Sequence, residues 1–150
     1  MANQVSSPIS RGNNLFLATV KAPQPELLFI YNANGGWLNG VLDTLHKTLS
    51  PATYPCSLCA ITYGARTMYP EWREFLQQLP ARTQFLHRDE LQQLPELAQE
   101  PLPAIFWRAS ELEPWQAFLS ATQLKPLDLP GVIRAVETRL RETNQPASGL

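Results

Sequence analysis

The stretch that decides the fold class covers residues 27–36 and reads Leu27-Leu28-Phe29-Ile30-Tyr31-Asn32-Ala33-Asn34-Gly35-Gly36. Its first half is a continuous apolar run, which predicts a short central strand buried on both faces of a sheet. Its second half is rich in residues that favour turns and positive φ. We therefore expect the strand to end near Tyr31 and the chain to turn into a helix.

Apolar runs and amphipathic stretches alternate along the rest of the chain, which is typical of an α/β fold. Besides the strand at 27–31, the sequence predicts strands at 60–63, 83–87 and 103–107. It predicts helices at 37–49, 70–79 and 129–141, where apolar residues recur at helical spacing. More weakly marked are an extra strand at 15–21, a short helix at 89–99 and a fifth segment at 115–125.

The order of these elements resembles the thioredoxin fold. The resemblance implies a three-layer α/β/α sandwich with a central mixed sheet and helices on both faces. Leu102-Pro103-Ala104 is similar to the start of the strand that follows the cis-proline of that fold. We therefore expect a cis Leu102–Pro103 bond, although only about 5–6% of X-Pro bonds in folded proteins are cis. The likeness concerns architecture and says little about chemistry.

The composition fits one small globular domain. The chain has 150 residues, of which 44% are apolar and 17% are charged. A net charge of -1 gives no reason to expect a nucleic acid or an anionic membrane as partner. The 14 prolines argue against a long helical bundle. We expect a flexible N-terminal arm at 1–14, a single α/β domain at 15–142 and a flexible tail at 143–150.

The first fourteen residues are polar and lack the apolar core of a signal peptide. No apolar run reaches the ~18 residues that a membrane helix needs. The prediction is a cytoplasmic protein without membrane insertion, and thiols in that compartment are usually reduced. The partner is expected to be a protein or a small thiol, which the sequence does not identify.

The main candidate for a functional site is Cys56-Ser57-Leu58-Cys59, which holds both cysteines of the chain. This spacing brings two sulfurs together in a turn or a first helical turn, but not in a straight strand. A reduced pair can attack a disulfide or bind a soft metal. Two small apolar side chains packed at the end of a strand are a third reading. All three readings stay open, and so does the question of whether the protein is an enzyme.

Asp43 and His46 stand three residues apart on the helix predicted at 37–49, with Asn39 on the same stripe. A carboxylate that orients an imidazole suits a base or a metal ligand. If the short connection brings His46 to the cysteines, then Cys56, Cys59 and His46 would suit zinc. Asp43 would be a fourth ligand or a partner of the imidazole. The alternative is a solvated face on which Asp43 pairs with Lys47.

A second polar cluster is His87-Arg88-Asp89-Glu90. The commoner meaning of such a run is the end of a strand that continues into a charged loop. The four tryptophans are most simply core or rim aromatic residues.

The central part of the chain resembles a small uncharacterised bacterial family. The matching residues are Tyr31-Asn32-Ala33, Gly36, Leu38-Asn39, Asp43, His46-Lys47, Ser50-Pro51, Thr53-Tyr54, Cys56, Leu58-Cys59, Thr62 and Gly64. Weaker matches continue through Trp72, Phe75, the run at 87–90 and Pro103. Such proteins are sometimes labelled GTPases, but residues 32–36 lack the lysine, the hydroxyl and the spacing of a phosphate-binding P-loop.

Overall fold

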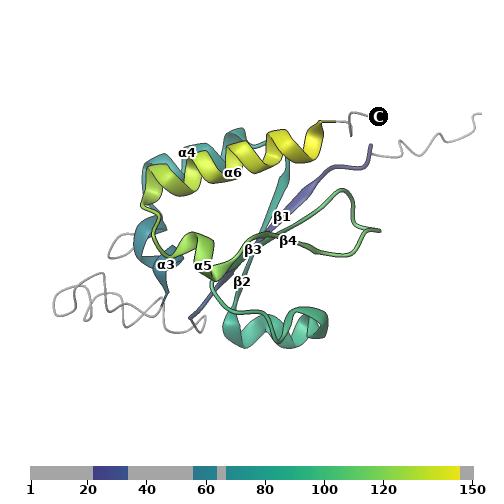
Figure 1. Cartoon of the computed structure of the whole chain (residues 1–150), viewed down its shortest axis with the longest axis horizontal. Helices are drawn as coiled ribbons and strands as arrows, with labels where there is room; N and C mark the ends of the chain where they lie inside the picture. Colours follow the sequence, from purple (N-terminus) through teal and green to yellow (C-terminus); the bar gives the residue numbers. More distant parts are fainter. Residues whose placement is uncertain (1–21, 34–55, 64–66, 146–150) are drawn as a thin grey trace, which may run out of the picture.

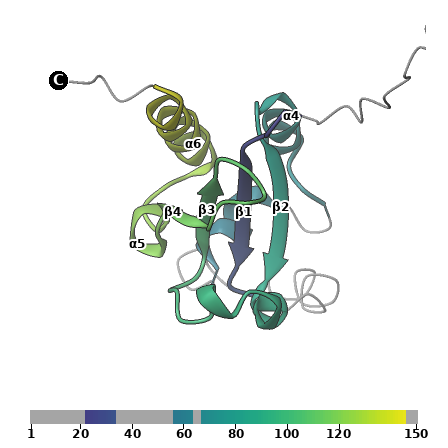
Figure 2. The ribbon, with the colours of Figure 1, turned by 90° about the vertical axis from the view of Figure 1, so that its right-hand side faces the viewer.

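The computed structural model of the chain describes residues 22–33, 56–63 and 67–145. These residues contain a four-stranded sheet with the order β2-β1-β3-β4 (Figures 1 and 2). Its strands are β1 (Glu26–Tyr31), β2 (Arg82–His87), β3 (Ala104–Arg108) and β4 (Gln116–Leu119). β1 runs parallel to β2 and antiparallel to β3, and β3 runs antiparallel to β4. The predicted α/β class and the mixed sheet are confirmed.

β1 is the central strand, as its continuous apolar run predicted. All six of its residues are buried, and it has hydrogen-bonded neighbours on both sides. Because side chains alternate along a strand, Leu27, Phe29 and Tyr31 enter one core cluster, whereas Leu28 and Ile30 enter the other. Burying each such side chain contributes about 1.5–3 kcal/mol, so this strand is the main apolar contributor to the sheet.

The first face of the sheet is covered by helices. These are α3 (Ser57–Thr62), α4 (Pro70–Gln78), the short α5 (Ala121–Leu124) and α6 (Leu129–Asn144). They contribute Leu58, Trp72, Leu124, Val132 and Val136 to the larger core cluster. The helices predicted at 70–79 and 129–141 are confirmed. α6 is longer than predicted, so residues 143 and 144, expected to begin the tail, belong to the helix.

The second face is covered by a segment that the sequence marked only as a short helix at 89–99. In the structure it forms two 3-10 helices, η2 (Arg88–Gln93) and η3 (Pro95–Leu97). Leu91 and Leu97 pack there against Leu28, Ile30 and Phe106. The Leu102–Pro103 bond before β3 is cis, as expected.

The strand predicted at 60–63 is wrong. Residues 57–62 form α3 instead, and Tyr63 makes only an isolated bridge to Met68. The β-branched and aromatic residues there favour a strand, but the local hydrogen bonds of the Cys56–Cys59 turn outweigh that preference. The weak segment at 115–125 holds β4 and α5.

Several predictions fall outside the described residues. These are the arm at 1–14, the extra strand at 15–21 and the helix at 37–49. The full three-layer sandwich therefore stays a prediction. Among the helices that the structure describes, none is long and apolar enough to cross a membrane.

Candidate functional site

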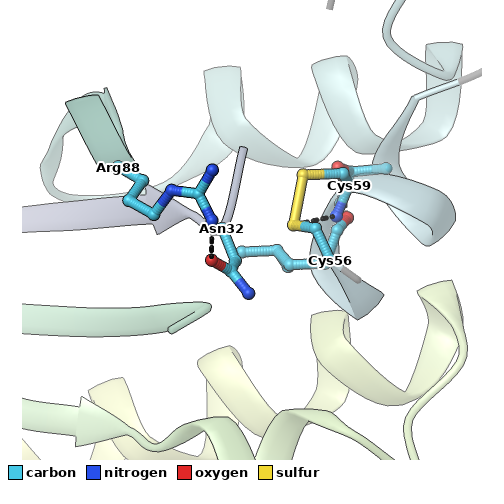
Figure 3. The surroundings of a disulfide bond; sticks show 6 residues. Asn32, Cys56, Cys59 and Arg88 are labelled. Carbon is cyan, nitrogen blue, oxygen red and sulfur yellow. Dashed lines mark hydrogen bonds between the residues drawn. A yellow bond between two sulfur atoms is a disulfide. The ribbon is translucent and has the colours of Figure 1, made fainter. Parts of the chain in front are cut away.

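Cys56 and Cys59 are joined by a disulfide (Figure 3), and α3, which begins at these cysteines, lies beside the end of β1 (Figure 1). Their Cα atoms are 5.3 Å apart. Cys56 is the residue that caps the start of α3, and Cys59 lies in the first turn of that helix. The sequence predicted that the two sulfurs meet in a turn or a first helical turn, and the structure shows the helical turn.

The sulfur of Cys56 takes the place of the side-chain oxygen that usually caps the start of a helix. Its Sγ accepts a hydrogen bond from the backbone N–H of Cys59 at 3.2 Å, and its carbonyl oxygen accepts one from Ala60 at 3.1 Å. The first N–H groups of a helix have no partner within the helix, and a Ser, Thr, Asp or Asn oxygen usually binds them. Here a sulfur does so, and the disulfide is therefore part of the start of α3.

Both cysteines are fully buried, with 0% of their surface exposed. They lie in the larger core cluster together with Ala33 and Leu58. A disulfide is uncharged and apolar, so it suits this environment. A bulky partner has no direct approach to either sulfur in this conformation.

Tyr31, the last residue of β1, links α3 to the sheet. Its ring centroid lies 5.8 Å from the ring of Tyr63, which directly follows α3, and 5.9 Å from the ring of His87 on β2. The side chain is almost completely buried. Burial raises the pKa of Tyr31 well above its usual range, and the neighbouring Tyr63 adds to the effect. Burial also raises the pKa of Tyr63.

The polar run at 87–90 lies at the same end of the sheet. The backbone N–H of Arg88 donates to the carbonyl oxygen of Ala33 at 3.0 Å, and Arg88 Nη1 donates to Asn32 Oδ1 at 3.5 Å (Figure 3). These contacts follow from the parallel register, which pairs Tyr31 with His87. The strand end was predicted, but it continues into a 3-10 helix rather than a loop.

His87 and Glu90 are held together by two contacts to the same carboxylate oxygen. The backbone N–H of His87 donates to Glu90 Oε2 at 2.8 Å, and His87 Nδ1 lies 2.8 Å from that oxygen. The first of these contacts, from the His87 backbone to the Glu90 side chain, is one half of the capping box of η2. The backbone hydrogen bond, followed by the ring contact, lowers the pKa of Glu90 below its usual value.

The raised pKa values of Tyr31 and Tyr63 predict a loss of stability in alkali. A tyrosine with a folded-state pKa above its unfolded value of about 10 keeps its proton in the folded protein after the unfolded chain has lost it. The resulting contribution is fully present below about pH 10 and is lost as the pH rises further. Urea unfolding at about pH 8 and about pH 10.5 should therefore show a fall in the free energy of unfolding. The free energy of unfolding of Tyr31→Phe should fall less over that pH interval. An equal fall in the variant and the wild type would exclude Tyr31 as the source.

The remaining candidates lie outside the described residues. Asn39, Asp43 and His46 belong to the segment 34–55, so their distance from the sulfurs is not defined. Within the described segments, no three His, Cys, Asp or Glu side chains gather as a metal site would require. The zinc hypothesis therefore depends on Asp43 and His46.

Comparison with known proteins identifies no relative. No protein-family profile, no curated protein sequence and no solved structure matches the chain. The functional proposal therefore depends on the geometry of the site and on the sequence.

Proposed function

We propose that this is a cytoplasmic redox-responsive protein whose site is the thiol–disulfide pair Cys56–Cys59. The observation that carries the proposal is a disulfide within one helical turn, with Cys56 serving as the cap of that turn. Disulfides in a reducing cytoplasm are usually transient and either catalytic or redox-sensing. A redox role is therefore the simplest reason for this pair in such a protein.

Two opposing effects decide how the reduced pair reacts. The N–H group of Cys59 would stabilise a Cys56 thiolate, and a hydrogen bond to a charged group contributes about 1.5–3 kcal/mol. Complete burial opposes the charge, because an ion removed from water costs several kcal/mol even after relaxation. Because the cost of burying a charge exceeds the contribution of the single hydrogen bond, this site disfavours the thiolate form of Cys56.

A neutral, buried dithiol is a slow nucleophile, since the thiolate is the attacking form. This favours a response to the redox state of the cell over rapid disulfide exchange with large substrates. The partner is then a small thiol or disulfide, or a protein that reaches the pair after α3 moves.

The thioredoxin-like sandwich is the finer part of the proposal. A parallel β1–β2 pair and antiparallel β3 and β4 support it. A helix at 37–49 packed on the second face of the sheet, observed through nuclear Overhauser contacts between that segment and the sheet, would establish the third layer. A strand in that segment would contradict it.

The central prediction is that Cys56 and Cys59 cycle reversibly in the folded protein. After equilibration with glutathione buffers, alkylation and mass spectrometry should show two thiols that appear and disappear together. The fraction reduced should follow a two-electron titration, with a tenfold change in the equilibrium constant for about 30 mV. Cys59→Ala should show one thiol at every potential. If the wild-type pair is reduced only when the protein unfolds, the disulfide is structural and the proposal fails.

Metal analysis of the reduced protein tests the main alternative. Zinc bound at one equivalent, and lost in both Cys56→Ser and His46→Ala, would assign the pair to a metal site completed by His46 and Asp43. A pair that neither cycles nor binds metal would leave a non-catalytic interaction domain with a structural C-x-x-C.

A further inference from the structure

α3 is a helix with little intrinsic support. It has only six residues, no acidic residue in its first turn and no basic residue in its last turn. Isolated helices shorter than about 12–15 residues are marginal in water, and nothing here complements the helix dipole. The start of α3 depends on Cys56, through its sulfur and its carbonyl oxygen.

The buried face of α3 packs into the core cluster that contains Tyr31. Leu58, Cys59 and Thr62 are buried, and the Thr62 hydroxyl donates to the Leu58 carbonyl oxygen at 2.7 Å. The Thr62 hydroxyl, which is the polar group of that face, thus has its hydrogen-bond partner within the helix itself. Beyond apolar packing, the ring contact between Tyr63 and Tyr31 connects the end of α3 to β1. The disulfide therefore fixes one end of α3. At the other end the aromatic contact reaches β1, and the Thr62 carbonyl oxygen accepts a hydrogen bond from the backbone N–H of Tyr69 at 2.9 Å.

We propose that the disulfide controls a local conformational switch. In the oxidised protein the disulfide holds α3 against β1, and its reduction releases α3 and exposes Tyr31. This inference rests on the proposed redox function. The chemical step breaks the Cys56–Cys59 bond and adds two electrons and two protons, which gives two thiols. The electrons come from two molecules of a small thiol, which leave as their disulfide.

The expected size of the effect follows from the length of the cross-link. A bond between residues three apart closes a very short loop, for which the chain-entropy relation corresponds to roughly a 20-fold change in a local folding equilibrium. The Cys59 amide also changes its acceptor, from a disulfide sulfur in a fixed position to a thiol that can rotate away. α4 and α6 carry no cross-link, so their equilibrium should not change.

Hydrogen exchange of the full chain, compared between the oxidised and reduced forms, tests the switch. We expect amides of residues 59–63 to exchange roughly tenfold faster or more after reduction. Amides of α4 and α6 serve as internal controls and should keep their protection. Cys59→Ala, which keeps the capping sulfur of Cys56 and removes the cross-link, should behave like the reduced wild type. Cys56→Ser also removes the cross-link but supplies a capping hydroxyl, so it should recover part of the protection.

Two outcomes would overturn the switch. Unchanged exchange in α3, in protein shown by alkylation to hold two thiols, would mean that the helix does not need the bond. Faster exchange throughout α4 and α6 would mean that the disulfide is a global staple. Both outcomes leave the redox function standing if the pair cycles. If the pair does not cycle, Cys59→Ala still reports whether the bond holds α3.

Discussion

Arg108→Ala is expected to lower the free energy of unfolding by about 3–5 kcal/mol. Its partner Glu26, the first residue of β1, has only 1% of its surface exposed. Arg108 Nε donates to Glu26 Oε2 at 2.6 Å, and Arg108 Nη2 completes a salt bridge to the same oxygen. Removing the guanidinium leaves a buried carboxylate with less compensation, which is among the most costly changes that a fold can undergo. Urea unfolding followed by circular dichroism measures the loss.

Arg82→Ala is the matched control. Arg82 Nη1 lies 3.2 Å from Glu26 Oε1, but its side chain is 47% exposed, whereas that of Arg108 is 18% exposed. Arg108 also lies over the Trp115 ring at 4.2 Å, a cation–π contact that Arg82 lacks in the described structure. Arg82→Ala should therefore cost about 1 kcal/mol. Equal losses for the two variants would contradict this assignment.

A double variant separates the charge from the packing. Glu26→Leu combined with Arg108→Met removes both ions and keeps similar volume, so most of the stability should return. If the double variant is as unstable as Arg108→Ala, the loss comes from packing on Trp115 and not from the stranded carboxylate.

The contacts of Glu26 with Arg108 and Arg82 are a feature that a sequence pattern cannot reveal. The apolar run at 27–31 predicted β1, because burial on both faces leaves a clear hydrophobic pattern. The segments at 83–87 and 103–107 predicted β2 and β3, although β2 is an edge strand and only partly buried. The strand predicted at 27–31 leaves out Glu26, which is the first residue of β1. Its arginine partner Arg108 is 82 residues away in the chain, and only the antiparallel register of β3 brings it alongside.

The candidate site, like the fold, was predictable from the sequence only in its local features. The C-x-x-C spacing alone predicted the paired sulfurs, since that geometry is local. The contacts of Tyr31 with Tyr63 and His87 depend on strand register and on where α3 packs, so no local pattern predicted them. The strand predicted at 60–63 failed for a related reason: residue preferences there ignore the hydrogen bonds that Cys56 supplies.

The second large effect is expected from Tyr31→Ala. Truncating a buried aromatic ring costs about 3–5 kcal/mol, because the lost contacts leave a cavity that the surroundings fill only in part. The Tyr31 ring stacks on Phe85 at 6.2 Å and contacts both Tyr63 and His87, so its loss affects α3 and β2 together. Chemical unfolding measures the total loss.

Tyr31→Phe separates the ring from its hydroxyl. This variant keeps the ring contacts and removes a buried hydroxyl that makes no hydrogen bond within the described structure, so it should change stability by less than about 1 kcal/mol. The two variants should also differ in hydrogen exchange. In Tyr31→Ala the amides of residues 59–63 should already exchange fast in the oxidised protein, because the contact that holds the far end of α3 is missing. In Tyr31→Phe they should stay protected until the disulfide is reduced. If α3 keeps its protection in oxidised Tyr31→Ala, the helix is held by its apolar face alone, and Tyr31 has no part in coupling the disulfide to the sheet.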